Sequence, residues 1–343
     1  MYQDIRKYII RLLLLTIPFV IFVGWYIYMD PFLVIDHYDN YYACRKGAYS
    51  LNQGYVGTSN LDNHYAEFQW NSFILGNSRS RYWKIDEWTK FLPAGSIGYH
   101  YDAHTESLTG IEKKVQYLDQ KGIDIKNALI VIDKSVLRQI KPVEEGIFML
   151  PPQLVDGNNW LTFQYRHFIT FANFDFLKEY FAPTKPEAEL TTDDLMWGEY
   201  MDYDYTKNEI SQTIIEKQIA EGTYYTESLY KSQFEGQQYP DFPSRVYIKE
   251  EEKQILQEIA RILRKHNTDC RIVISPLYEQ SRINPQDLQS LKVIFGQDKV
   301  FDFSGANRYS ADYHNYYERS HYRPCVASEL MKEVYSHQDY SNE

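Results

Sequence analysis

The run from Asn127 to Asp133, Asn-Ala-Leu-Ile-Val-Ile-Asp, constrains the fold of this chain more than any other segment. A continuous apolar run of this length is typical of a strand that is covered on both faces, as in a parallel sheet. Further strands are expected at Phe73–Leu75, Gly95–Ile97, Arg271–Pro276 and Val300–Phe303. Together the five segments predict a sheet that is buried on both sides.

Helical patterns lie between and after these strands. Residues Glu106–Gln120 and Lys249–Lys265 carry apolar side chains at the spacing of one helix face, and shorter helices are expected at Pro285–Phe295 and Cys325–Tyr335. Alternation of strand and helix indicates a parallel sheet with crossover connections. We therefore expect an α/β fold with three layers around a five-stranded parallel sheet, beginning near Asn71.

Ahead of this predicted core, the run from Tyr8 to Met29 is apolar except for Arg11. About 20 apolar residues suffice for a helix to cross a bilayer, and an arginine near one end can extend its charge to the interface. Basic residues precede the run and acidic residues follow it, which favours a cytoplasmic N-terminus. We expect residues 1–30 to form a cytoplasmic tip and a signal-anchor helix. A cleaved signal peptide is the alternative, although no small-x-small cleavage site follows the run.

The remaining chain divides into four expected parts. Residues 31–70 lack sustained periodicity and are expected to form a stalk and an approach loop. The α/β domain is expected over residues 71–336, with an insertion or lid at about 140–245 on one edge of the sheet. Residues 337–343 are expected to form a tail.

Within the insertion we expect helices at Asn159–Tyr180 and Asn208–Glu221, separated by an irregular acidic and aromatic stretch at 183–205. The aromatic side chains of that stretch could stack on sugar rings. Packing within an irregular lid is the commoner role of such side chains, and we favour it.

Charge and cysteine content exclude some classes of function. The formal net charge of −11 argues against a nucleic-acid partner, which would require a basic stripe. The spacing of Cys44, Cys270 and Cys325 fits no zinc site. One pair could form a disulfide in an oxidising compartment, or all three could remain thiols. No metal or organic cofactor is expected.

The strand expected at Phe73–Leu75 runs directly into the tight turn Gly76-Asn77-Ser78. A serine in such a turn places its hydroxyl at the C-terminal end of the sheet, where open α/β proteins bind their ligands. Backbone N–H groups that follow it could hold an oxyanion. By itself the pattern also fits a serine that only caps the next helix.

A second polar motif, Glu318-Arg319-Ser320-His321, lies ahead of the last predicted helix. A serine nucleophile needs a base, and the base needs a carboxylate that fixes its tautomer. An acid three residues before a histidine can supply both groups from one loop. A surface histidine among tyrosines is the plainer interpretation of His321. Asp312 and His314 form a second acid–histidine pair just upstream, and a solvated loop is the plainer interpretation of these two.

With these two motifs the chain resembles the SGNH (GDSL-like) hydrolase superfamily, and more narrowly the membrane-anchored SGNH-like proteins of bacterial cell envelopes. The family's Gly-Asp-Ser block corresponds to Gly76-Asn77-Ser78, and its Asp-x-x-His block to Glu318–His321. The resemblance implies a flavodoxin-like SGNH fold over roughly residues 70–336. It also implies that Ser78 is the nucleophile, His321 the base and Glu318 the orienting acid.

The resemblance is incomplete at the oxyanion hole. The family's Gly-x-Asn-Asp block is missing, because the corresponding strand ends in Asp133-Lys134-Ser135. The loop that would carry the family's second glycine, 98–105, has none after its first residue. Candidate oxyanion or substrate-binding residues are therefore Asn77, Arg79, Asp102 and His104. Arg79 could bind an anionic substrate group or pair with a core carboxylate.

The function implied by the resemblance is that of a serine esterase or O-acyltransferase acting on a cell-envelope polysaccharide. Its expected location is the bacterial inner membrane, as a single-pass protein with the C-terminal domain outside the cytoplasm. A transferase would need an acyl donor, supplied by a membrane-embedded partner. The alternative is a non-catalytic scaffold with the same fold that binds polysaccharide or an export partner.

Overall fold

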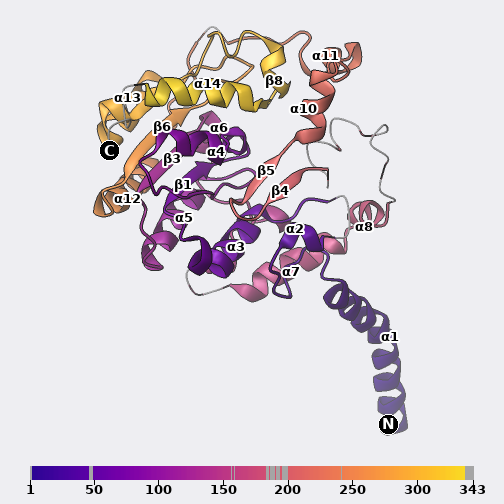
Figure 1. The fold of residues 1–343 in the computed structure, drawn as a ribbon. Coiled ribbons are helices and arrows are strands. Elements are labelled where there is room, and N and C mark those ends of the chain that lie inside the picture. The colour runs from indigo at the N-terminus through magenta and orange to yellow at the C-terminus, as the bar shows by residue number, and fades with distance from the viewer. Residues whose placement is uncertain are drawn as a thin grey trace.

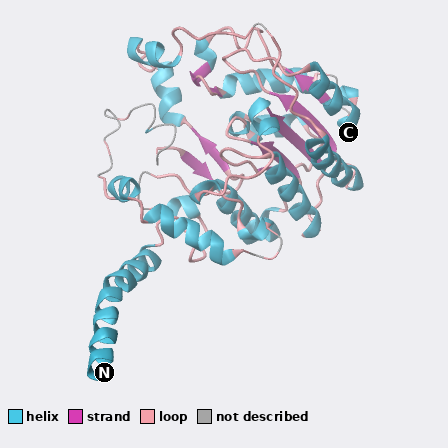
Figure 2. Cartoon of the chain, turned by 180° about the vertical axis from the view of Figure 1, so that it is seen from behind, coloured by secondary structure: helices cyan, strands magenta, loops and turns pink. Residues whose placement is uncertain are grey.

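A five-stranded parallel sheet forms the centre of the molecule (Figures 1 and 2). The computed structural model describes residues 2–45, 49–155, 157, 159–182, 185, 190, 194, 200–240 and 242–336. The strands are β1 (Ser72–Gly76), β2 (Gly98–His100), β3 (Asn127–Ile132), β6 (Asp269–Ile274) and β7 (Val300–Asp302), in the spatial order β2-β1-β3-β6-β7. All neighbours are parallel, which confirms the expected sheet. Counted within the sheet the order is 2-1-3-4-5, as in flavodoxin-like folds.

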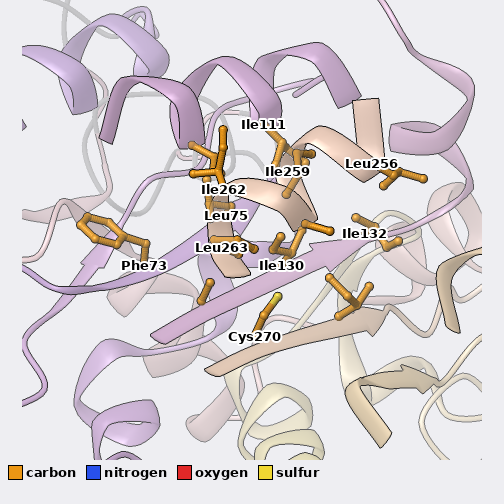
Figure 3. Packing of buried hydrophobic residues seen from close by; sticks show 14 of the residues in the cluster. Phe73, Leu75, Ile111, Ile130, Ile132, Leu256, Ile259, Ile262, Leu263 and Cys270 are labelled. Atoms are coloured by element: carbon orange, nitrogen blue, oxygen red, sulfur yellow. The ribbon is translucent and has the colours of Figure 1, made fainter. Parts of the chain in front are cut away.

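Helices α5 (Leu108–Gln120), α12 (Glu250–Lys265) and α13 (Pro285–Phe295) cover one face of the sheet. Figure 3 shows side chains of the strands, among them Leu75 and Ile130, packed against Ile259 and Leu263 of α12. These residues are fully or almost fully buried. Alternate strand residues point to opposite faces, so every second residue of each central strand enters this cluster.

The opposite face is covered by α14 (Pro324–Tyr335) and by the short helix α4 (Ile85–Trp88). Leu129 and Val131 of β3 pack there against Leu330 and Met331 of α14. Both faces of the sheet are therefore buried, and this burial explains why β3 is a continuous apolar run. The segment after Ser78 is divided into η1 (Ser80–Tyr82), α4 and η2 (Thr89–Phe91).

Helix α1 (Tyr2–Met29) extends away from the body (Figure 1). Its residues Ile5–Met29 are long and apolar enough to cross a membrane, as the sequence predicts. Only its C-terminal turns pack on the body, against α7 (Trp160–Phe171) and α8 (Phe174–Tyr180). Both of these helices lie within the range expected to be helical.

The expectation of an irregular stalk is wrong for the second half of residues 31–70. After the short helix α2 (Tyr41–Cys44), the 16-residue helix α3 (Gln53–Phe68) packs into the domain. Most of its buried residues are small or polar, so it shows no apolar periodicity. Polar contacts secure it instead: Tyr99 on β2 donates to the carbonyl of Gly57 at 2.6 Å.

Two predicted boundaries are also wrong. The second strand is Gly98–His100 rather than Gly95–Ile97, because Gly95 lies in a turn that the Ser96 N–H closes on the Pro93 carbonyl. The segment Asn208–Glu221 is not one helix. Its first residues form β5 (Glu209–Ser211), which pairs with β4 (Asp202–Asp204), and α10 (Thr213–Ala220) follows.

The turn of the β4–β5 hairpin lies against the outer edge of β2, the first strand in the sheet order. The His100 N–H donates to the Lys207 carbonyl at 2.8 Å, and the Asn208 amide donates to the His100 carbonyl at 2.6 Å. This part of the chain thus lies along the β2 edge of the sheet and continues through α10 and α11 (Glu227–Gln233). Most of the acidic stretch 183–205 and the tail 337–343 lie outside the described residues.

Candidate active site

Ser78 lies in the turn that follows β1, at the C-terminal edge of the sheet. The preceding Gly76 has φ +152°, and a Cβ there would lie 2.4 Å from the Val131 carbonyl oxygen. Glycine is therefore required for the chain to turn so close to β3. Ser80 closes the turn, because its N–H and its hydroxyl both donate to the Asn77 carbonyl at 2.9 and 2.6 Å. Ser78 itself is half-buried.

The two distant motifs meet at this turn. His321 and Glu318 lie on the hairpin of β8 (Tyr316–Glu318) and β9 (His321–Tyr322). His321 Nε2 is 2.7 Å from Ser78 Oγ, and its Nδ1 contacts a Glu318 carboxylate oxygen. The other carboxylate oxygen accepts the Ser320 N–H at 2.8 Å, which fixes the orientation of Glu318. Serine, imidazole and carboxylate thus form a continuous hydrogen-bonded chain of the kind expected from the sequence.

The surroundings favour the neutral form of His321. Burial lowers its pKa below the ordinary value, against the opposing effect of Glu318, and the cations Arg79 and Arg81 lower it further. Burial would raise the pKa of Glu318, but its contact with His321 and the Ser320 N–H hold that pKa below the usual range. A neutral imidazole whose Nδ1–H donates to Glu318 presents an unprotonated Nε2 to the serine hydroxyl.

Arg79 joins three segments of the site. Its Nη1 lies 2.7 Å from Asp133 at the end of β3, and its Nε donates to the Ser320 carbonyl at 2.8 Å. The Asn77 amide donates to the same carboxylate at 2.8 Å. Of the two roles considered for Arg79, the structure shows pairing with a core carboxylate. Both Asn77 and Arg79 thus direct their polar groups into the protein framework, holding the histidine hairpin beside the serine turn.

Asp102 and His104, the other two candidates, lie in the loop after β2 and are buried beside Arg81. Arg81 Nη2 is 3.1 Å from the His104 ring nitrogens, and Gln53 donates to Asp102 at 3.3 Å. Burial lowers the pKa of His104 well below its ordinary value, and Arg81 and His321 reinforce the shift. His104 is therefore neutral and accepts from Arg81. Gln53 belongs to α3, so part of this cluster comes from the segment that the sequence suggested was a stalk.

The insertion also supports the histidine hairpin, a role that the sequence did not reveal. Tyr317 on β8 donates to Glu216 on α10 at 2.6 Å, and Arg323 pairs with Glu216 at 2.6 Å. Tyr224 donates to the Tyr317 carbonyl at 2.9 Å. In the sequence, only the abundance of tyrosine in the insertion and around β8 hinted at this contact, and it did not indicate which residues pair. The insertion is thus joined directly to the element that carries His321.

The second acid–histidine pair, Asp312 and His314, lies just before β8, in and beside the short helix η7 (Tyr313–Asn315). His314 Nδ1 contacts Asp312 at 2.9 Å, and both side chains are more than half exposed. His321, and not His314, is the histidine that contacts Ser78. Cys44, Cys270 and Cys325 are free thiols. Within the described ranges, no group of three or more His, Cys, Asp or Glu side chains is placed to hold a metal ion.

The serine turn also supplies one free backbone donor. Among the described residues, the N–H of Ser78 has no acceptor, whereas the neighbouring Arg79 N–H donates to the Asn77 side chain at 3.0 Å.

Comparison of the chain with protein-family models, with curated proteins and with solved structures found no match.

Proposed function

We propose that this protein is a serine esterase or O-acyltransferase of the SGNH type. The observation that supports the proposal is the contact between Ser78 Oγ and His321 Nε2 at 2.7 Å, with Glu318 on the other ring nitrogen. The three groups come from segments about 240 residues apart in the chain. A nucleophile, a base and an orienting acid are the groups that acyl transfer through serine requires.

In the proposed reaction, Ser78 Oγ attacks the carbonyl carbon of an acyl ester while His321 Nε2 takes the hydroxyl proton. The oxygen anion of the tetrahedral intermediate is stabilised by the Ser78 N–H, which has no acceptor within the described chain. His321 then gives its proton to the departing alcohol, and an acyl-serine remains. Water or a sugar hydroxyl loses its proton to His321 and attacks the acyl-serine. His321 returns that proton to Ser78 Oγ as the carboxylic acid or the new sugar ester leaves. Glu318 stabilises the imidazolium in both halves.

The proposed substrate is an O-acylated or acyl-accepting cell-envelope polysaccharide at the bacterial inner membrane. Helix α1, long and apolar enough to cross a bilayer, would hold the domain next to polymer emerging from the cell. In the transferase version, a membrane-embedded partner supplies the acyl donor. Both versions pass through an acyl-serine, and they differ in the donor that forms it and in the group that attacks it.

Labelling with a fluorophosphonate probe tests the proposal, because the probe reacts with an activated serine. The full-length wild-type protein is expected to label, and the Ser78→Ala and His321→Ala variants are expected to lose labelling. Ser228→Ala is the matched control, since Ser228 is an exposed serine on α11. Equal, weak labelling of wild type and Ser78→Ala would contradict the enzyme proposal.

The same result would favour the alternative, a non-catalytic scaffold that binds polysaccharide or an export partner. One observation supports that alternative. Where the SGNH family carries the block with its oxyanion asparagine, this chain has Asp133-Lys134-Ser135. The Asp133 carboxylate accepts hydrogen bonds from Arg79, Asn77 and Ser135. An uncompensated loss of one oxyanion donor costs about 10²–10³ in rate, so a weak enzyme would still label measurably.

A further inference from the structure

Helix α7 carries large apolar side chains on its exposed face as well as on its buried face, with Arg166 as the exposed charged residue within it. Its inner face, with Phe163 and Phe171, is buried. The outer face has Leu161, Tyr165 and Ile169 at intervals of four residues, and Leu161 is 83% exposed. Phe174 at the start of α8 is 78% exposed. A contiguous exposed apolar patch of this kind marks a protein or membrane contact, and none of the described residues covers the outer face of α7.

The same helix packs against the side of α1. Phe168 of α7 lies 6.2 Å from Phe19 and 5.8 Å from Phe22, measured between ring centroids. Trp25 stacks on Phe181, just after α8, at 5.6 Å. A span of about 20 residues that starts at Tyr8, after Arg6 and Lys7, ends near Ile27, so Phe19 and Phe22 lie below the outer boundary of the hydrocarbon. Their contacts place α7 at that boundary.

The connection between α1 and the body is not a free hinge. Asp30, which follows α1, is buried and accepts the N–H groups of Val34 at 2.9 Å and Asp36 at 3.0 Å. Phe32 and Val34 enter the same buried cluster as Tyr26 of α1. Figure 1 shows α7 and α8 as the part of the body nearest α1. The exposed apolar face is thus held at a fixed position along the axis of α1, beside the candidate membrane span.

From this arrangement we propose that α7 and α8 form an interfacial membrane-binding surface that inserts its outer side chains among lipid acyl chains. Interfacial helices bury an apolar face at the boundary between headgroups and acyl chains. The aromatic residues Trp160, Tyr165 and Phe181 suit this depth. The body then rests on the bilayer instead of standing off on a stalk. This inference depends on α1 crossing the membrane but not on the proposed catalysis.

Accessibility of nitroxide labels on the full-length protein in phosphatidylcholine nanodiscs tests the proposal. In a Cys44→Ser, Cys325→Ser background, labels are attached through Leu161→Cys and, separately, Phe174→Cys. The control is Val293→Cys, because Val293 is 69% exposed and belongs to α13, a helix that lies far from α1 in Figure 1. Labels at positions 161 and 174 are expected to lose accessibility to a water-soluble nickel chelate and to gain accessibility to oxygen, relative to position 293.

Two outcomes would overturn the proposal. Nickel accessibility at positions 161 and 174 equal to that at position 293 would show that the face points into water. Protection from both nickel and oxygen would show that protein covers the face, as in a dimer. The three substituted residues are exposed, so the variants are expected to fold, and the unfolding transition of each variant checks this. Retained fluorophosphonate labelling is not required for either result, because the active site is not probed.

Discussion

Replacing Arg79 by methionine tests how the site is held together. Asp133 is only 1% exposed, and Arg79 is the single cation with which it pairs among the described residues. Removal of Arg79 leaves a buried carboxylate with only the Asn77 amide and Ser135 as donors. Removing one partner of a buried ion pair costs about 3–5 kcal/mol of stability, because the remaining charge stays desolvated. The Ser320 carbonyl also loses its donor, but it is half-buried, so water replaces part of that bond.

We therefore expect Arg79→Met to lower the free energy of unfolding by about 3–5 kcal/mol. The assay is urea unfolding of the full-length protein in detergent, followed by tryptophan fluorescence, with the midpoint and slope compared between variants. Arg308→Met is the matched control, because Arg308 pairs with the exposed Glu333. Such a surface pair contributes about 0–1 kcal/mol. Adding Asp133→Asn to Arg79→Met removes the unpaired charge and is expected to recover most of the loss.

The pH dependence of the Arg79→Met effect has a definite sign. Burial would raise the pKa of Asp133, but Arg79, Ser135 and Asn77 hold it below its ordinary value. A lowered folded-state pKa gives stability that is present above the unfolded-state pKa and is lost as the pH falls through the folded-state pKa. The difference between wild type and Arg79→Met should therefore be largest near neutral pH and shrink in acid. A loss below about 1 kcal/mol at neutral pH, like that of the surface control, would refute this reasoning.

Two further predictions concern His321, the proposed catalytic base, and the turn that contains Gly76. Because the pKa of His321 is lowered, the acid limb of kcat/KM for a chromogenic ester should have its midpoint below 6.5. Glu318→Gln should move that midpoint lower still and reduce kcat by about 10²-fold or more, since Glu318 raises the pKa of His321; an unchanged profile would count against the role of Glu318. Gly76→Ala should destabilise the protein by at least about 2 kcal/mol in urea unfolding, because its Cβ would collide with the Val131 carbonyl. Gly95 also has a positive φ, but no atom lies within 4 Å of the position of its Cβ, so Gly95→Ala should lower the free energy of unfolding by only about 1 kcal/mol. Equal losses for Gly76→Ala and Gly95→Ala would contradict the predicted collision with Val131.

The sequence by itself determined the elements whose side-chain pattern reports burial. The strand β3 could be predicted because its apolar run is continuous, and α12 because its apolar residues recur with the period of a helix. The membrane-length helix α1 was readable from length and composition alone. Ser78 and the Glu318–His321 pair were also selected from local residue types, because the groups needed for acyl transfer are few.

Only the tertiary structure decided which of these groups meet. Helix α3 is buried through small and polar residues, so no local pattern revealed it, yet it brings Gln53 to the site. The choice of Asp133 as the partner of Arg79 depends on β1 and β3 being neighbours in the sheet. The apolar outer face of α7 supports the proposed membrane contact only because α7 packs beside α1. Periodicity reports how an element is buried, whereas the partners that bury it are set by long-range packing.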